Sequence, residues 1–198
     1  MKNSIIAIIL IGVISLSSCT KDRDFNGERG DIEKFLGVEL VESLDEIGFK
    51  MYYGEKPPQI EGDFLVNSAD LKSSTVPNDP DSHTFNDLKI SFKNQNNKEL
   101  TIDYQGDELD ANSVGIGTFI AGNGKYFTVA MKTETTKDNG GKAESAFVIT
   151  GKMTKAGIVD VEVAVFLIKI IEENPNDKFI PENTGRVIVD GNGLATRV

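Results

Sequence analysis

The chain offers few of the side chains that most often perform covalent chemistry or bind zinc. It has one cysteine, Cys19, and one histidine, His83, in 198 residues. His83 lies in the polar stretch DPDSHTFND, so a Ser-His-Asp or Cys-His arrangement would depend on a histidine in a loop. Zinc sites favour several Cys or His ligands. The sequence therefore predicts neither nucleophilic catalysis of these types nor bound zinc.

Carboxylates are abundant but form no complete catalytic or metal-binding pattern. Asp107, Glu108 and Asp110 cluster, and residues 190–193, DGNG, match part of a calcium loop. That segment lacks the third acidic position and the closing glutamate, because Leu194 follows it, and a turn is the preferred interpretation. Carboxylate pairs can support glycoside hydrolysis, but none lies in an identifiable cleft. We expect a protein that is not an enzyme and that needs no metal or cofactor.

The segment around Cys19 predicts export and lipid attachment. Lys2 precedes a continuous apolar run, residues 5–16, which is typical of a secretory signal. The run is shorter than the roughly 20 apolar residues that span a bilayer. It ends in Leu16-Ser17-Ser18-Cys19, which resembles the bacterial lipobox. The resemblance implies that residues 1–18 are a signal peptide and that Cys19 becomes the acylated first residue; the alternative is a cysteine that stands there by chance.

The same resemblance implies a location. One acyl chain anchors a protein only marginally and two or more anchor it stably, and Thr20 is not the aspartate associated with retention in the inner membrane. We expect a lipid-anchored protein of the bacterial outer membrane, facing the periplasm or the cell surface, with residues 19–30 as a flexible tether. The net charge of −10 argues against nucleic acid as a partner, because phosphates need Lys and Arg.

After the tether, the pattern predicts a helix and then a long run of strands. Residues 31–58 read as a helix, with its apolar face in 38–47, followed by a prolyl segment that Pro57 and Pro58 force to be extended. From residue 59 to 198 the apolar residues alternate with period two. The expected strands are 63–67, 87–93, 99–104, 114–121, 125–135, 144–154, 158–171 and 186–190.

Short turns between these runs indicate an antiparallel meander, and a long meander must close or stack to remove its edges. We therefore expect a mainly β fold in which about eight strands close into a lipocalin-like barrel after a short N-terminal helix. Residues 158–171 are apolar on both faces at one end, so we expect the helix or a loop to cover them. Residues 69–82 and 174–181 are expected to be loops, the first over an open end of the barrel.

The order of several short motifs resembles that of a group of Bacteroidetes lipoproteins of lipocalin-like shape, mostly of unknown function. The motifs are the lipobox, the segment 54–64 (GEKPPQIEGDF), the segment 117–122 (GTFIAG) and the segment 186–195 (RVIVDGNGLA). The step Gly62-Asp63-Phe64 is also similar to the Gly-x-Trp motif of true lipocalins, although the chain has no tryptophan. The resemblance implies a barrel with an interior able to hold an apolar ligand, and it implies no catalytic residue.

Two interpretations of the barrel remain open at this point. In the first, it binds a small apolar or amphipathic ligand, and the candidate lining is Val114, Ile116, Phe127, Val129, Met131 and Phe147. Side chains can instead fill a barrel of this size. In the second interpretation, the protein is an accessory subunit of an outer-membrane or surface complex and binds an envelope protein. Its candidate contact surface is then Tyr52, Tyr53, Pro57 and Pro58.

Overall fold

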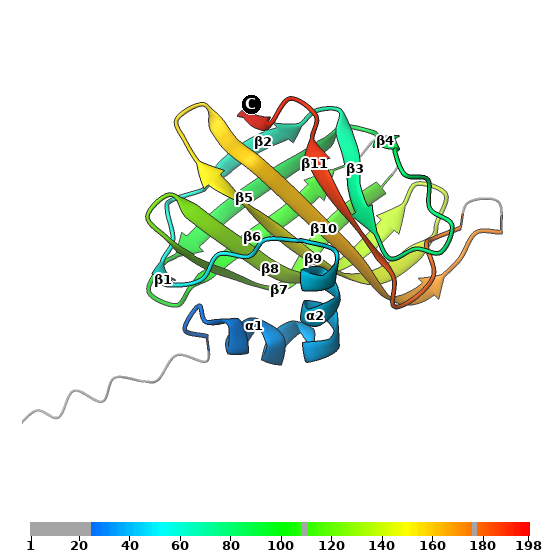
Figure 1. Ribbon diagram of the computed structural model, residues 1–198, viewed down its shortest axis with the longest axis horizontal. Helices are drawn as coiled ribbons and strands as arrows, with labels where there is room; N and C mark the ends of the chain where they lie inside the picture. Colours follow the sequence, from blue (N-terminus) through cyan, green and yellow to red (C-terminus); the bar gives the residue numbers. More distant parts are fainter. Residues whose placement is uncertain (1–24, 108–110, 176–177) are drawn as a thin grey trace, which may run out of the picture.

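The computed structural model describes residues 25–107, 111–175 and 178–198 (Figure 1). Two short helices, α1 (Arg29–Leu36) and α2 (Val38–Glu46), precede the strands. The first six strands are β1 (Glu55–Lys56), β2 (Gly62–Val66), β3 (Ala69–Ser74), β4 (Thr84–Phe85), β5 (Leu88–Asn96) and β6 (Thr101–Asp107). The others are β7 (Ala111–Asn123), β8 (Tyr126–Lys137), β9 (Lys142–Met153), β10 (Gly157–Glu172), β11 (Gly185–Asp190) and β12 (Leu194–Arg197).

An antiparallel meander closes on itself and confirms the predicted fold class. The hydrogen bonds run from β2 through β5, β6, β7, β8, β9, β10 and β12 and back to β2, a ring of 8 strands. Closure occurs where β12 lies between β10 and β2, with Ala195 opposite Ile158 and Thr196 opposite Leu65. A closed ring leaves no long edge exposed to other chains.

β11, β3 and β4 form a branch of the sheet that leaves the ring at β10. β10 pairs antiparallel with β12 through residues 157–159 and with β11 through residues 162–166, and the register shifts by two residues between the two pairings. The bend between β11 and β12 is held by Asp190, whose carboxylate accepts hydrogen bonds from the backbone N–H groups of Asn67, Asn192 and Leu194 at 2.8 to 3.1 Å. The DGNG segment is thus a turn, as preferred from the sequence.

The prediction of a long loop at residues 69–82 is wrong for the first half of that segment. Residues 69–74 form β3 and pair with β11, so that the loop comprises only residues 75–83. The sequence signal was weak because Leu71 is the only large apolar residue of ADLKSS, and most of this strand is half-buried rather than alternating. The short strand β12 was also missing from the expected strands.

The helices pack outside the barrel, where they cover the sheet formed by β7 to β10 (Figure 1). Ile32, Val41 and Leu44 point toward small outward-facing residues of the strands, and these form one buried cluster. The small residues are Ala121, Ala130, Ala146 and Ala164. Short side chains let a helix approach the sheet closely, and this cover explains why residues 158–171 are apolar on both faces.

The folded part begins earlier than the sequence indicated. Phe25 is buried and stacks on Phe119, with 4.5 Å between the ring centroids, and α1 begins at Arg29. Residues 25–30 therefore belong to the fold and not to a tether. The expected single helix is two helices, broken at Gly37, which has a φ of 105° that a residue with a side chain rarely adopts. None of the helices in the described residues is long and apolar enough to cross a membrane.

The two ends of the barrel are packed differently. We call the end with the β7–β8 and β9–β10 turns the closed end, and the end with the β8–β9 turn the open end (left and right in Figure 1). Toward the closed end, large side chains fill the interior and are fully buried: Ile60, Phe64, Phe92, Phe127 and Ile158. This half is a solid hydrophobic core.

Candidate ligand-binding site

A cavity of about 280 Å³ lies at the open end, and we call it the cup. Its volume is just below the roughly 300–1,000 Å³ that ligand pockets occupy. Apolar side chains make up most of its wall: Phe85, Ala111, Phe147, Val165, Leu167, Phe179, Ile180 and Ile188. Asn86, Ser113, Thr135, Lys137, Ser145, Lys178 and Arg186 complete the lining.

The cup exists because inward-facing residues become smaller along the strands. On β9 the inward positions run Ile149, Phe147, Ser145 from the closed end to the open end. On β8 they run from Phe127 to Thr135. A serine or threonine fills far less volume than a phenylalanine, so the same ring of strands is filled at one end and hollow at the other.

Hydroxyl groups provide part of the polar wall of the cup. The side-chain oxygens of Ser113 and Thr135 lie 2.8 Å apart and share a hydrogen bond across β7 and β8. Deeper in the barrel, the Thr133 hydroxyl donates to the carbonyl of Ser145 at 3.3 Å. Ser113, Thr133 and Ser145 are all buried. The wall therefore presents hydroxyls to a ligand beside a larger apolar surface.

Three basic residues lie at the rim of the cup in the part of the chain that the structure describes. The Lys137 ammonium lies 4.7 Å from the centroid of the Phe179 ring and donates to the carbonyl of Lys178 at 3.5 Å. The Arg186 guanidinium lies 5.4 Å from the centroid of the Phe85 ring. Lys137, Lys178 and Arg186 all line the cup, and the described lining contains neither Asp nor Glu.

Arg186 is held in place by the loop 75–83. Its Nε and Nη2 donate to the two carboxylate oxygens of Asp79 at 2.8 and 2.6 Å. These hydrogen bonds lower the pKa of Asp79, because they favour the ionised carboxylate. The bidentate pair fixes the guanidinium against Phe85 and fastens the loop to β11.

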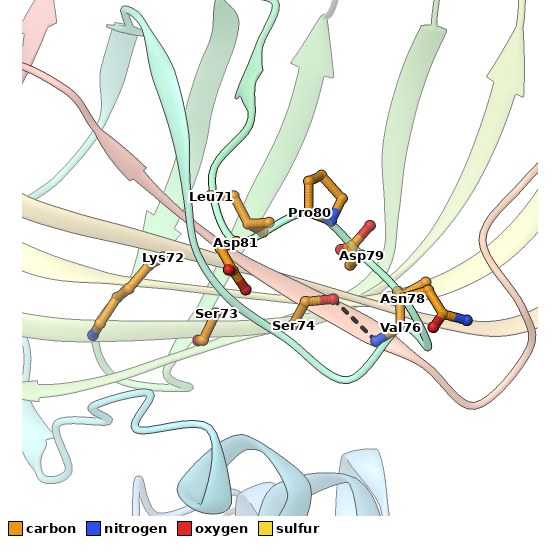
Figure 2. A pocket seen from close by; sticks show the side chains of 9 residues that line it. All are labelled: Leu71, Lys72, Ser73, Ser74, Val76, Asn78, Asp79, Pro80 and Asp81. Carbon is orange, nitrogen blue, oxygen red and sulfur yellow. Dashed lines mark hydrogen bonds between the residues drawn. The ribbon is translucent and has the colours of Figure 1, made fainter.

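A second hollow, of about 230 Å³, lies between β3 and this loop (Figure 2). Within it, the Ser74 hydroxyl accepts a hydrogen bond from the backbone N–H of Val76 at 3.0 Å, drawn as a dashed line in Figure 2. The lining is mostly polar: Leu71, Lys72, Ser73, Ser74, Val76, Asn78, Asp79, Pro80 and Asp81. The hydrogen bonds of these residues and the ion pair between Asp79 and Arg186 order the loop. Because this hollow is mostly polar, the cup is the better candidate for binding an apolar molecule.

The predicted lining residues fall into three groups. Phe147 lines the cup as expected. Phe127, Val129 and Met131 face the interior but belong to the solid core. Val114 and Ile116 are each 54% exposed, so the structure corrects their placement in the interior.

The misplacement of Val114 and Ile116 has a local cause in β7. The register with β8 shifts between Gly115 and Thr118, and Gly117 has a φ of 74°. Such a bulge inserts an extra residue and reverses which side chains point inward. Ser113 faces the interior before the bulge, and Thr118 and Ile120 face it afterwards.

The predicted contact surface is largely part of the fold. Tyr52 stacks on Tyr126 with a centroid distance of 4.8 Å, and its backbone N–H donates to the Thr128 hydroxyl at 2.6 Å. Tyr53 is half-buried beside the helices, and this burial raises the pKa of its phenol. Pro57 is buried and Pro58 is half-buried. These residues attach the prolyl segment to the barrel.

The remaining sequence candidates add no reactive centre to the described residues. Cys19 lies outside them. His83 is exposed, with its ring 4.4 Å from the centroid of Phe85. Within residues 25–107, 111–175 and 178–198, no group of three or more His, Cys, Asp or Glu side chains could hold a metal ion. The site residues that the sequence did not suggest are the hydroxyls and cations of the cup. A change in the size of the inward residues along 127–135 and 145–149 would have indicated the hydroxyls, whereas no sequence signal marked the cations.

Comparison of the chain with protein-family models, with curated proteins and with solved structures gives no match.

Proposed function

We propose that this protein is a non-catalytic lipoprotein of the bacterial envelope whose barrel binds a small amphipathic ligand in the cup. The observation that carries the proposal is the contrast within one barrel between a filled half and a hollow of about 280 Å³. An apolar wall with a few hydroxyl and basic groups is the usual composition of a small-molecule site. Phe147, at 3% exposure, joins the wall to the solid core and gives the cup a rigid side.

The binding proposal can be tested on the chain from residue 19 onward with Cys19 replaced by serine, which retains every described residue. The measurement is calorimetric titration with decanol and decanoate, followed by mass spectrometry of any molecule that the protein carries through purification. We expect saturable binding of at least one amphiphile with a stoichiometry near one. Absence of saturable binding for both would refute the ligand-binding proposal.

The anchoring part of the proposal rests on the lipobox resemblance around Cys19. Processing would leave Cys19 as the acylated first residue and hold the barrel at the outer membrane. Replacement Cys19→Ala should yield an uncleaved precursor without the lipid. Intact mass and detergent-phase partition measure both properties, and a mature, membrane-bound Cys19→Ala protein would contradict the anchor.

One observation supports the second candidate function, an accessory interaction subunit. Val114 and Ile116 are large apolar side chains exposed on the outer face of β7, where a protein partner would bury them. This function would be favoured over ligand binding if a fixed partner co-purified with the protein and if Val114→Ser and Ile116→Ser abolished that co-purification.

A further inference from the structure

We infer that the closed end of the barrel faces the membrane that holds the anchor, and that a patch of tyrosine and lysine side chains there contacts anionic phospholipid head groups. The inference rests on the lipid anchor of the proposed function and adds the orientation of the barrel to it. We call the following residues the tyrosine–lysine patch: Lys50, Tyr52, Lys125, Tyr126, Lys152 and Lys155.

Two stacked tyrosine rings form the centre of the patch. The rings of Tyr52 and Tyr126 stack with 4.8 Å between their centroids, and Tyr126 is 41% exposed. The Lys50 ammonium lies 5.0 Å from the centroid of the Tyr52 ring, and the Lys152 ammonium lies 5.9 Å from that of Tyr126. Tyrosine rings and long cationic side chains are the groups that favour the head-group layer of a bilayer.

Two exposed turns extend the patch. Lys125 lies in the β7–β8 turn, and its carbonyl accepts a hydrogen bond from the backbone N–H of Met153 at 2.8 Å. This bond places the β9–β10 turn, which contains Lys155, beside the β7–β8 turn. The ammonium groups of both exposed lysines are therefore available to a surface that approaches the closed end.

The local charge of this surface is positive although the whole chain has a net charge of −10. Within the described residues, no salt bridge joins a lysine of the patch to a carboxylate. The neighbouring strand β1 adds one charge of each sign, from Glu55 and Lys56, and residues 20–24 (TKDRD) add two of each. Because screening limits electrostatic attraction to about 8 Å at physiological salt, the lysines nearest the lipid outweigh distant carboxylates.

The chain leaves the fold beside the patch. The carbonyl of Gly27 accepts a hydrogen bond from the backbone N–H of Gly54 at 2.8 Å, and the carbonyl of Gly54 accepts one from Gly122 at 2.9 Å. Gly54 is two residues from Tyr52, and Gly122 begins the turn that leads to Tyr126. The described chain accordingly begins near β1, at the left in Figure 1, so the anchor is attached to the side that carries the patch.

The outer face of the helices is the other surface near the anchor, and its charge is unsuitable. α2 contains four acidic residues and no basic one, and an anionic lipid surface would repel them. The closed end is therefore the side that an anionic membrane attracts. In this orientation the cup opens away from the lipid, and rotation about the membrane normal stays free.

A single tryptophan can report this orientation, because the chain has no tryptophan and one cysteine, Cys19. The chain from residue 19 onward is coupled through the Cys19 thiol to a maleimide lipid in vesicles of phosphatidylcholine and phosphatidylglycerol. Quenching of the tryptophan by brominated lipids then measures its closeness to the bilayer. The coupling is chemical, so the result does not depend on acylation in the cell, which the Cys19→Ala variant tests separately.

We expect at least about twofold stronger quenching in Tyr126→Trp than in Ile171→Trp, since an aromatic ring at the closed end would lie in the head-group layer. Ile171 is the matched control, because it is 45% exposed and lies near the open end. Ile116→Trp, at a position 54% exposed on β7, tests the other exposed apolar surface. Quenching in Ile171→Trp or Ile116→Trp as strong as in Tyr126→Trp would overturn the inference and leave both the anchor and the cup intact.

Paired charge reversals test the lysines in the Tyr126→Trp protein. Lys125→Glu with Lys155→Glu should reduce quenching at least about twofold, because anionic lipid attracts clustered lysines. Lys169→Glu with Lys178→Glu changes the net charge equally at exposed positions near the open end and should leave quenching nearly unchanged. An equal reduction in both pairs, or none in the first, would overturn the role of the patch.

Discussion

The two ends of the barrel are built from the same strands and have opposite properties. On β8, Phe127 near the closed end is fully buried in a solid core, and Thr135 near the open end lines a cavity. The strands and their pairing are continuous between these positions. The size of the inward side chains therefore decides whether a part of the barrel is a core or a cavity. One half of the barrel can provide stability while the other half provides a site.

The largest expected effect is on stability, at the closed end. Phe127→Ala should lower the free energy of unfolding by about 3–5 kcal/mol, because it removes a fully buried ring and leaves a cavity. Urea denaturation followed by circular dichroism measures the loss. A loss below about 1 kcal/mol would mean that this half is not a solid core.

The next effect is on binding, at the open end. Ser145→Phe should place a ring in the cup and reduce decanoate affinity by more than about tenfold, with an overpacking cost of roughly 1–3 kcal/mol in stability. The control Ser145→Ala removes the hydroxyl without filling the space and should change affinity by less than about threefold. Unchanged affinity in the folded Ser145→Phe protein would show that the ligand lies elsewhere.

The ion pair that orders the loop beside the open end should give a smaller, pH-dependent effect. Asp79→Asn should cost roughly 1–2 kcal/mol at neutral pH, since the hydrogen bonds to Arg186 lose their ionised acceptor. The folded-state pKa of Asp79 is lowered, so its stabilisation is complete above the ordinary pKa of about 4 and is lost as pH falls through the lowered value.

Thermal unfolding from pH 7 to pH 2 measures this dependence. The difference in melting temperature between the wild type and Asp79→Asn should be largest at neutral pH and shrink below about pH 4. A difference that stays constant down to pH 2 would show that ionisation of Asp79 does not contribute. Asp63 is a useful comparison for this pH dependence. A hydrogen bond from Ser91 also lowers the pKa of Asp63, but Asp63 lies away from the loop 75–83.

The smallest effect is expected outside the barrel. Val114→Ser and Ile116→Ser should each change stability by less than about 0.5 kcal/mol and leave decanoate binding unchanged, because both side chains face away from the interior. Chemical denaturation measures the change in stability, and calorimetric titration measures decanoate binding. A loss of 2 kcal/mol or more would place these residues inside the barrel and contradict the bulge in β7.

The sequence predicted most of the ring, because the evidence was repeated in β2 and in β5 through β10, but it missed β12, the strand that closes the ring. Alternation in runs such as Leu88, Ile90 and Phe92 indicated strands, and the short turns between runs indicated antiparallel neighbours. Residues 158–171 indicated an outer cover, which the helices supply. These signals are local, and the closed fold agrees with each of them.

The site was harder to predict because it depends on a change of face and on residues far apart. One extra residue at Gly115–Gly117 reverses the inward positions of β7, and strict alternation placed Val114 and Ile116 on the wrong side. The cup also brings together Lys137, Lys178 and Arg186, which are distant in sequence and meet only after the ring has closed. Their side chains alone look like ordinary solvated surface.

The packing of Phe25 against Phe119 limits how far the protein can reach. Under the proposed lipidation of Cys19, six residue steps separate the anchor from Phe25, a span of at most about 20 Å even when fully extended. The barrel would then stay within a short distance of the membrane that holds its anchor. It could rotate above the lipid surface but could not carry a ligand across the space between two membranes. A ligand delivered elsewhere would need another carrier.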